Sequence, residues 1–251
     1  MKSKISIYLL TILAACYGQL DIGKYLKVCD RNSADVNDCM VDAVQDGLAV
    51  LANGIEDLGV PAVDPYHQKE LRVEYKNNQI AAKMSMRDIF VYGLKEAKVH
   101  DARLRADEDR FHLEVDLTAP KVFVTGQYEG EGRYNSLRIN AHGTFNATMT
   151  DLVYTWKLDG IPEKRDDKIY VRINSFYMRP DVGNIESYLS NDNPETRELT
   201  NLGNRFSNNN WRALYREFLP IAQDNWNKIG IRVANKIFLK VPYDQLFPAN
   251  N

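Results

Sequence analysis

The sequence predicts an α+β fold in which a long C-terminal helix is wrapped by a highly curved antiparallel β-sheet. Two observations lead to this fold class. About the last forty residues carry apolar side chains at helical spacing, which is typical of a helix with one buried face. The middle of the chain alternates apolar and polar residues, which is typical of strands with one dry face. No long helical pattern interrupts these strands, and this favours antiparallel pairing.

The first 18 residues have the layout of a secretory signal peptide. Lys2 and Lys4 precede an apolar run of about a dozen residues, and small residues follow around Gly18. A transmembrane anchor would need about twenty apolar residues. We therefore expect residues 1–18 to be removed and residues 19–251 to form a single secreted domain.

The charge balance of the remaining chain limits the classes of partner that we expect. Removal of the leader takes away two lysines and no acidic residue, which leaves 30 Lys and Arg against 34 Asp and Glu. A nucleic-acid partner needs a basic footprint, which this mildly acidic composition does not supply. No later segment is apolar enough to span a membrane. We expect no nucleic-acid partner, no transmembrane segment and a monomeric protein.

Two cysteines remain after the leader, Cys29 and Cys39, with nine residues between them. They allow one pairing, and a disulfide agrees with export. A zinc site would need nearby histidines, and a catalytic thiol would need a base that the sequence does not place. We expect a disulfide that fastens a short loop to the start of the first helix, and no metal site.

The first helix and the strands follow in order along the chain. A helical pattern after Asp38 carries Met40, Val44, Leu48, Leu51 and Ile55, and it ends before the breakers Gly59, Pro61 and Pro65. Strand patterns then occupy residues 71–76, 80–87, 111–118, 137–149 and 169–173. The predicted turns are Asn77-Asn78, residues 130–132, and Asp159-Gly160 before an exposed hairpin tip at residues 163–168.

The C-terminal helix is predicted from Trp211 to about Lys240, a length of roughly 45 Å at 1.5 Å per residue. Its apolar stripe consists of Trp211, Leu214, Tyr215, Phe218, Ala222, Trp226, Ile229, Val233 and Ile237. Pro220 lies inside this pattern and removes one helical hydrogen bond. It predicts a bend in one helix; the alternative is two helices that meet near Leu219.

A single layer of sheet rolled around a helix does not easily fill the space between them, and an unfilled apolar space is a site for an apolar ligand. The candidate lining residues on the dry faces are Met84, Met86, Leu113, Val115, Val122, Val124, Ile139, Phe145, Met149, Val171 and Ile173, which face Trp211, Tyr215 and Phe218. Ordinary core packing explains each of them at least as well. The flexible thioethers of Met84 and Met86 favour contact with ligands of varied shape. Tyr128 and Trp156 offer a hydrogen bond either to a polar ligand end or to the protein itself.

Catalytic motifs are missing from the sequence. It contains no nucleophile elbow, H-E-x-x-H, P-loop or dinucleotide fingerprint. The histidines His67, His100, His112 and His142 are scattered, and the acidic runs fall in predicted turns. We expect neither enzymatic activity nor a cofactor. One glycosylation sequon begins at Asn146, on the polar face of the longest predicted strand, and it predicts a glycan there.

Three segments of the chain carry a resemblance. One holds Cys29, Cys39 and the turn GVPAVDP at residues 59–65; the central one is VTGQYEGEGRYNSLRINAHGTFNATM at residues 124–149; the last ends in KVPYDQLFP at residues 240–248. In order and spacing they resemble the insect takeout and juvenile-hormone-binding protein family across residues 19–248.

The resemblance implies an extended roll, related to tubular lipid-binding folds, with a tunnel for a hydrophobic ligand. It also places Cys29 and Cys39 at the N-terminal disulfide of the family. The hormone carriers of this family have a second disulfide, for which this chain has no cysteines. This departure favours the takeout-like branch and leaves open whether juvenile hormone is the ligand.

The sequence therefore predicts a secreted, non-enzymatic carrier of a small hydrophobic ligand. The ligand would be a juvenile-hormone-like terpenoid, a fatty acid or another lipid, held in an internal apolar tunnel. The resemblance adds a role in hormonal, circadian or feeding-related signalling, through a receptor that the sequence does not identify. The alternative is a secreted interaction module with a filled core, acting through its surface on a receptor, membrane or microbe.

Overall fold

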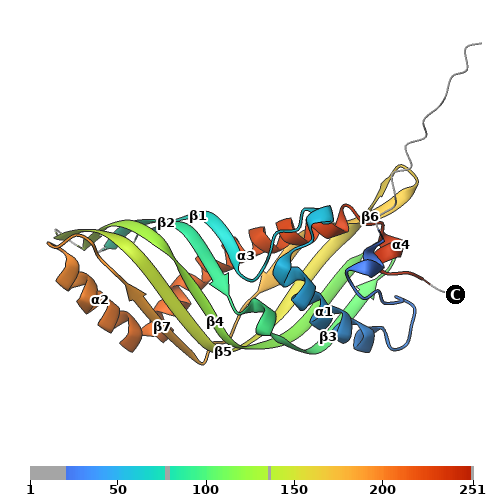
Figure 1. Cartoon of the computed structure of the whole chain (residues 1–251), viewed down its shortest axis with the longest axis horizontal. Helices are drawn as coiled ribbons and strands as arrows, with labels where there is room; N and C mark the ends of the chain where they lie inside the picture. The colour runs from blue at the N-terminus through green and yellow to red at the C-terminus, as the bar shows by residue number, and fades with distance from the viewer. Residues whose placement is uncertain (1–20, 77–79, 135–136, 250–251) are drawn as a thin grey trace, which may run out of the picture.

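One antiparallel sheet of seven strands curls around a long helix in the computed structural model, which describes residues 21–76, 80–134 and 137–249 (Figure 1). The strands are β1 (Tyr66–Lys76), β2 (Ile80–Tyr92), β3 (Lys98–Ala106), β4 (Phe111–Tyr134), β5 (Leu137–Arg165), β6 (Lys168–Met178) and β7 (Asn184–Leu189). The α-helices are α1 (Val36–Asn53), α2 (Arg197–Asn209), α3 (Trp211–Phe238) and α4 (Tyr243–Leu246). Short 3₁₀ helices lie at Ile22–Lys24, Glu56–Leu58 and Leu94–Glu96. This arrangement is the predicted fold class.

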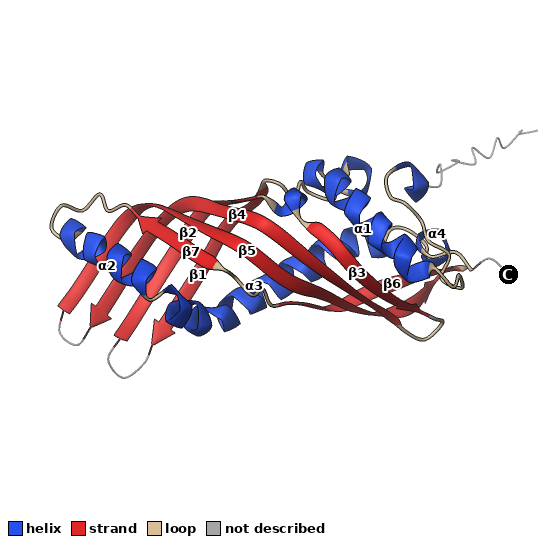
Figure 2. Ribbon diagram, turned by 90° about the horizontal axis from the view of Figure 1, so that it is seen from below, coloured by secondary structure: helices blue, strands red, loops and turns tan. Residues whose placement is uncertain are grey.

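The two central strands carry different neighbours at their two ends. β4 pairs with β5 along its length, with β3 at one end and with β2 at the other, and β5 pairs with β6 at one end and with β7 at the other. We call the section β3-β4-β5-β6 the disulfide half, and the section β1-β2-β4-β5-β7 the far half. Figure 2 shows the two halves end to end along the long axis, with α1 and α4 at the disulfide half and α2 at the far half.

The set of β4 residues that point inward changes between the two halves. In β4 the inner positions are odd-numbered up to Ala119 and even-numbered from Val122 onward, and both of these side chains are buried. The pairing register passes through this point unbroken, with Ala119 opposite Leu152 and Val122 opposite Met149. Asp151, with a φ of 55°, adopts the left-handed conformation that short polar side chains tolerate. Each half therefore shows its own clean alternation in the sequence.

The disulfide half has a solid core. Phe111 is fully buried, and its ring centroid lies 5.0 Å from that of Phe238 and 5.4 Å from that of Phe247. Tyr243 of α4 joins the same aromatic cluster. The ending KVPYDQLFP thus closes this end of the roll. Cys29 and Cys39 form the predicted disulfide, which fastens the loop before α1 to that helix.

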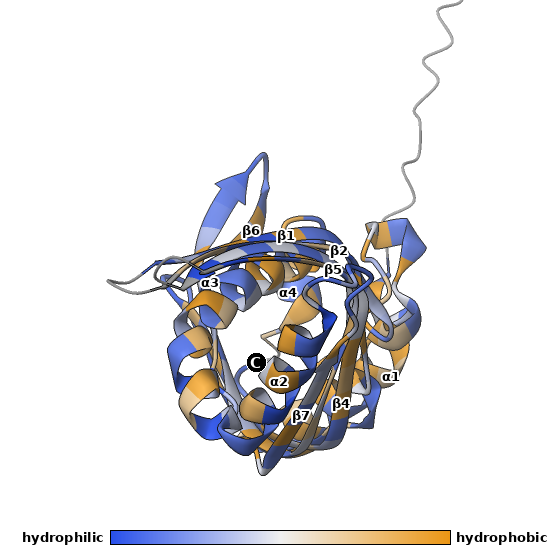
Figure 3. Ribbon diagram, turned by 90° about the vertical axis from the view of Figure 1, so that its left-hand side faces the viewer, coloured by the Kyte–Doolittle hydropathy of each residue, from blue (hydrophilic) through white to orange (hydrophobic). Residues whose placement is uncertain are grey.

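The helix α3 runs without interruption from Trp211 to Phe238, with Pro220 inside it. The single-helix prediction is confirmed, and the alternative of two helices meeting near Leu219 is wrong. Figure 3 shows the sheet curled about α3 when the roll is viewed along its axis. Gly230 allows α3 to approach β6 closely, because a Cβ at this position would lie 2.3 Å from the ring of Phe176 in β6.

Amide side chains from three helices close the open edges of the sheet. Backbone N–H and C=O groups at such edges need partners to be stable and to avoid pairing with other chains. In α2, Asn204 accepts a hydrogen bond from Leu189 N at 3.0 Å and donates one to Leu189 O at 2.9 Å. The same kind of contact joins Asn208 to Ser187, Asn235 of α3 to Ile173, and Gln45 of α1 to Val99 and Ala97. The helices are thereby hydrogen-bonded to the sheet as well as packed on it.

Several boundaries differ from the sequence prediction. The first helix spans Val36–Asn53, so Ile55 follows it, and the sequence patterns missed β3, β7 and α2. The predicted turn at residues 130–132 is wrong, because Gly130 and Gly132 lie within β4. The turn at Asp159-Gly160 is also wrong, since β5 continues to Arg165 and the hairpin tip is at residues 166–167. The leader and the Asn77-Asn78 turn lie outside the described residues.

Candidate functional site

The inner face of the far half forms a broad apolar surface beneath α3. The ring of Tyr75 in β1 lies 6.1 Å from that of Phe218 in α3, measured between centroids, so this face of β1 points toward the helix. The strand register continues the face across the sheet in three rows. These are Tyr75, Ala82, Gly132 and Ile139; Val73, Met84, Gly130 and Ala141; and Leu71, Met86, Tyr128 and Gly143.

Small residues distinguish this face from the inner face of the disulfide half. Five of its twelve positions are glycine or alanine, whereas the corresponding rows of the disulfide half pair Leu113 with Leu158, Val115 with Trp156, and Leu117 with Tyr154. Apart from Tyr128, every residue of the three rows is only partly buried. A Cβ placed on Gly130 would have no neighbour closer than 3.6 Å. The far half therefore holds inward apolar surface that the protein does not fully cover.

The residues predicted to line a ligand space divide between the two halves. Leu113, Val115, Val122, Val171 and Ile173 are buried in the solid core, where packing accounts for them. Val124, Met149 and Trp156 are partly buried against that core. Met84, Met86, Ile139 and Phe145 lie half-buried in the far half, as do Trp211 and Tyr215 on α3. Phe218 is 44% exposed.

Three polar side chains on or near the inner face of the sheet, Tyr128, Trp156 and Tyr215, have protein partners. The hydroxyl of Tyr128 donates to Ser190 O at 2.7 Å, and the indole of Trp156 donates to Met178 Sδ at 3.2 Å. Tyr215 donates to Pro180 O at 2.6 Å, and burial raises the pKa of this hydroxyl to about 12. Desolvation likewise raises the pKa of Tyr128. Both hydroxyls are thus neutral at physiological pH.

Helix α2 adds an apolar stripe that the sequence analysis missed. Leu199, Leu202 and Phe206 are 38%, 53% and 60% exposed. At 100° per residue they lie on the side of α2 opposite Asn204 and Asn208, which bind the edge of β7. Their i, i+3, i+7 spacing is the sequence signal that would have revealed this helix.

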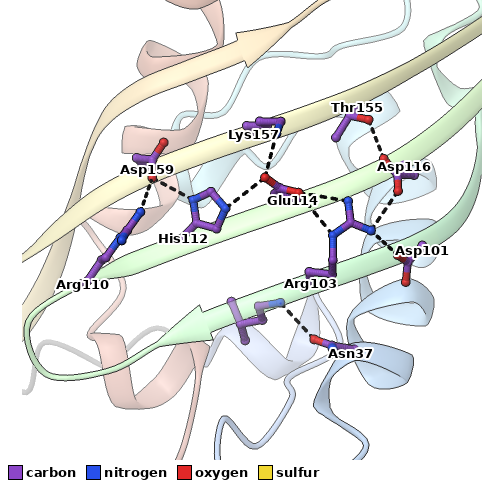
Figure 4. A network of polar contacts seen from close by, with 11 residues as sticks. Asn37, Asp101, Arg103, Arg110, His112, Glu114, Asp116, Thr155, Lys157 and Asp159 are labelled. Carbon is purple, nitrogen blue, oxygen red and sulfur yellow. Dashed lines mark hydrogen bonds and ion pairs between the residues drawn. The ribbon is translucent and has the colours of Figure 1, made fainter.

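A network of charged side chains occupies the outer face of the disulfide half (Figure 4). Arg103 of β3 pairs with Asp101, with Glu114 at 3.0 Å and with Asp116 at 2.9 Å. Lys157 reaches Glu114 at 2.8 Å. The pKa of Glu114 is lowered to about 2, first by the hydrogen bond from Lys157 and then by that from Arg103. The pKa of Asp116 is lowered as well, chiefly by Arg103.

This network joins three strands. Thr155 donates to Asp116 at 2.5 Å, and His112 lies between Glu114 and Asp159. Each carboxylate in the network is paired with a cation or a hydroxyl, which is typical of a structural brace. No group of His, Cys, Asp or Glu side chains in the described part of the chain has the arrangement of a metal site.

Asn146 lies on the outer face of β5, opposite Thr125 of β4 and Tyr188 of β7. Its side chain is half-buried. A glycan at this position would project away from α3, and glycosylation stays a prediction. Within residues 21–76, 80–134 and 137–249, no helix is both long and apolar enough to cross a membrane.

One solved structure in particular has this architecture. The structure is similar to the crystal structure of Epiphyas postvittana Takeout 1, with a TM-score of 0.71 and 22% sequence identity over 90% of this chain and 100% of that chain. It also aligns with a lipopolysaccharide binding protein, with a TM-score of 0.32 and 12% identity over 74% of this chain and 37% of that chain. No curated protein sequence matches the chain significantly.

The family comparison covers nearly the whole chain. Residues 7–248 match the model of the haemolymph juvenile hormone binding protein family. The match includes the disulfide, both halves of the sheet, α3 and the closing segment at residues 240–248. It agrees with the resemblance carried by the sequence motifs and with the curled sheet around a C-terminal helix. The chain belongs to the haemolymph juvenile hormone binding protein family.

Proposed function

We propose that this protein is a carrier that holds a small hydrophobic molecule between α3 and the inner face of the far half. One observation supports this proposal above all: the same sheet has a solid core in one half and uncovered inward apolar surface in the other. Leu117 and its partner Tyr154 are buried, whereas Val73 and Met84, which face each other in the far half, are only partly buried. A bound apolar molecule would cover that surface.

The energetics of such binding are favourable. Removing apolar surface from water stabilises the bound state by about 0.8 kcal/mol per methylene group. A ligand of ten to fifteen carbons would gain roughly 8 to 12 kcal/mol, from which the cost of association is subtracted. Affinities around micromolar or tighter are therefore expected from apolar burial alone.

The inner surface also restricts the ligand's chemistry. The hydroxyls of Tyr128 and Tyr215 already donate to backbone carbonyls, so neither is free to donate to a ligand. The surface thus favours a molecule whose buried part is wholly apolar, such as a terpenoid, the chain of a fatty acid or another lipid. The family's description as juvenile hormone binding supports a ligand of this class. Roles in hormonal, circadian or feeding-related signalling remain predictions from the resemblance.

We further propose that the protein is secreted and acts by binding rather than catalysis. The leader at residues 1–18 has the composition of a signal peptide, and the Cys29–Cys39 disulfide fits an oxidising compartment. The described carboxylates of the charged network are paired on the outer face, away from the proposed ligand surface.

A titration of delipidated protein with fluorescent fatty-acid and terpenoid probes tests the carrier function. Saturable one-to-one binding, displaced by unlabelled ligand, is the expected result. Mass spectrometry of lipid extracted from protein purified from its native fluid would then identify the ligand. Absence of probe uptake by folded, delipidated protein would contradict the carrier function and favour the interaction module with a filled core.

A further inference from the structure

A basic cleft lies on the outer face at the end of the far half, remote from the disulfide. Its volume is about 390 Å³, within the range of small-molecule sites. Four cations line it, Lys76, Lys83, Arg133 and Arg138, together with the carboxylates Glu74 and Glu131 and with Tyr75, Ala81, Ala82, Gly132 and Asn140. Figure 1 shows this end of β1, β2, β4 and β5 at the left, opposite α1 and α4.

The charges in the cleft are unevenly matched. Lys83 pairs with Glu74 at 3.4 Å, but no ion pair within the described residues involves Lys76, Arg133 or Arg138. Arg133 and Arg138 are direct cross-strand partners. Like charges opposite each other destabilise a sheet, so this pair is unfavourable for the fold alone. The chain as a whole has a formal net charge of −2, which makes the cleft a local exception.

The strand register arranges these cations around a small hollow. In one outer row, Ala81 lies between Lys76 of β1 and Arg133 of β4, and Arg138 of β5 follows. Neighbouring strands are about 4.8 Å apart, so the two cations flanking Ala81 start roughly 10 Å from each other. The short side chain of Ala81 leaves room between them for a tetrahedral anion. Arginine also offers a planar fork of donors that matches phosphate oxygens.

We propose that this cleft binds the phosphate of an anionic phospholipid at a membrane surface, and so docks the far end of the protein on lipid. The phosphate would sit over Ala81, between Lys76 and Arg133, with Arg138 as a further donor. Binding of the phosphate would relieve the repulsion between Arg133 and Arg138. No described carboxylate forms an ion pair with either arginine, so the phosphate would supply the missing negative charge. The site lies on the opposite face of the sheet from the proposed hydrophobic ligand, so neither assignment depends on the other.

Sedimentation of the protein without its leader, residues 19–251, with lipid vesicles tests this docking. Vesicles of phosphatidylcholine are compared with vesicles that also contain about 30% phosphatidylglycerol, which gives a negative surface. The test variant is R133Q/R138Q. The matched control is R72Q/R87Q, which removes two arginines from the same outer face, where each is ion-paired with Glu70 or Glu129. Circular dichroism and thermal unfolding confirm that each variant is folded.

The proposal predicts binding to the anionic vesicles that weakens as salt is raised, with little binding to phosphatidylcholine alone. Each basic residue near such a surface contributes about fivefold in affinity, so R133Q/R138Q should bind about 30-fold more weakly. The charge-conserving variant R133K/R138K should retain most of the binding. R72Q/R87Q should change it by less than about threefold.

Three results would overturn the proposal: no preference for anionic vesicles, an equal loss in R72Q/R87Q, or saturation of the cleft by inorganic phosphate without vesicle binding. The last outcome would indicate a soluble anion as the ligand. Uptake of the fluorescent hydrophobic probes is measured on the same variants in the absence of vesicles. Because the cleft is on the outer face, R133Q/R138Q should take up these probes as the wild type does, so failure of docking and failure of the carrier function give different results.

Discussion

Asn235 of α3 forms two hydrogen bonds with the backbone of Ile173 in β6. The amide N–H of Ile173 donates to Asn235 Oδ1 at 2.9 Å, and Asn235 Nδ2 donates to Ile173 O at 2.8 Å. Ile173 is buried, so water does not replace these bonds if they are lost. One helical side chain thus satisfies both polar groups of an edge residue.

Asn235→Leu should therefore destabilise the fold by about 2 to 3 kcal/mol, since it leaves a buried N–H and a buried C=O without partners. Urea denaturation monitored by circular dichroism measures the change. Lys236→Leu is the matched control, because it introduces the same side chain at the next, exposed position. Equal stability of the two variants would show that the edge contact is unimportant.

Gly130→Val should abolish or strongly weaken binding of hydrophobic probes without unfolding the protein. A Cβ at Gly130 would point toward the proposed ligand surface, and its three nearest neighbours would be Lys83 O at 3.6 Å, Ala141 O at 3.9 Å and Met84 Cε at 3.9 Å. Valine is also favoured in strands, so the stability should be unchanged or higher. Probe titration and thermal unfolding are measured together. Gln127→Val, on the outer face of the same strand, should bind as the wild type does, and unaltered binding by Gly130→Val would contradict the proposed location.

Phe111→Ala should lower the free energy of unfolding but leave the affinity for hydrophobic probes almost unchanged. Phe111 is fully buried in the aromatic cluster of the disulfide half, so its truncation should cost about 3 to 5 kcal/mol. The proposed ligand surface lies in the other half. At a temperature where the variant is folded, its probe affinity should be within about twofold of wild type. A folded variant that has lost binding would indicate that the ligand is held in the disulfide half.

Acid should weaken the fold through Glu114. Its pKa is lowered from 4.5 to about 2, so the carboxylate contributes stability above its ordinary pKa, and this contribution is lost as the pH falls from about 5 toward 2. Glu114→Gln should lose about 1 to 2 kcal/mol at neutral pH and show a shallower decline in this window. Denaturation at several pH values measures both effects. Glu129→Gln is the control, because its ion pair with Arg87 is exposed and contributes little; an identical pH dependence for the two variants would contradict the role of Glu114.

The sequence predicted the parts of this protein that depend on local periodicity. The stripe from Trp211 to Ile237 predicts α3, because a helix of this length must bury one face. The alternation at residues 111–118 and 137–149 predicts strands whose dry sides face one way. The two cysteines that remain after the leader, Cys29 and Cys39, allow one pairing and predict the disulfide. Each of these patterns involves neighbours in the chain.

Predictions failed for residues whose role is a contact with a segment far away in the sequence. Gly130 and Gly132 suggested a turn, since glycine favours turns in sequence, but they are inner positions of β4 that place no side chain on the face toward α3. Helix α2 is short and mostly polar, and it is positioned by asparagines that bind the edge of β7. The local signal for α2 is its apolar stripe at Leu199, Leu202 and Phe206, whereas the contacts of its asparagines with β7 leave no such signal in the sequence.

The sequence by itself determined that apolar surface is turned inward around one long helix, because its hydrophobic periods allow few other arrangements. Only the tertiary structure decided where that surface is filled. The phase change between Ala119 and Val122 and the choice of partner strands place large side chains opposite each other in one half, and glycine and alanine opposite each other in the other. Packing density depends on which residues meet across the sheet, and pairing between strands is a property of the fold rather than of any one segment.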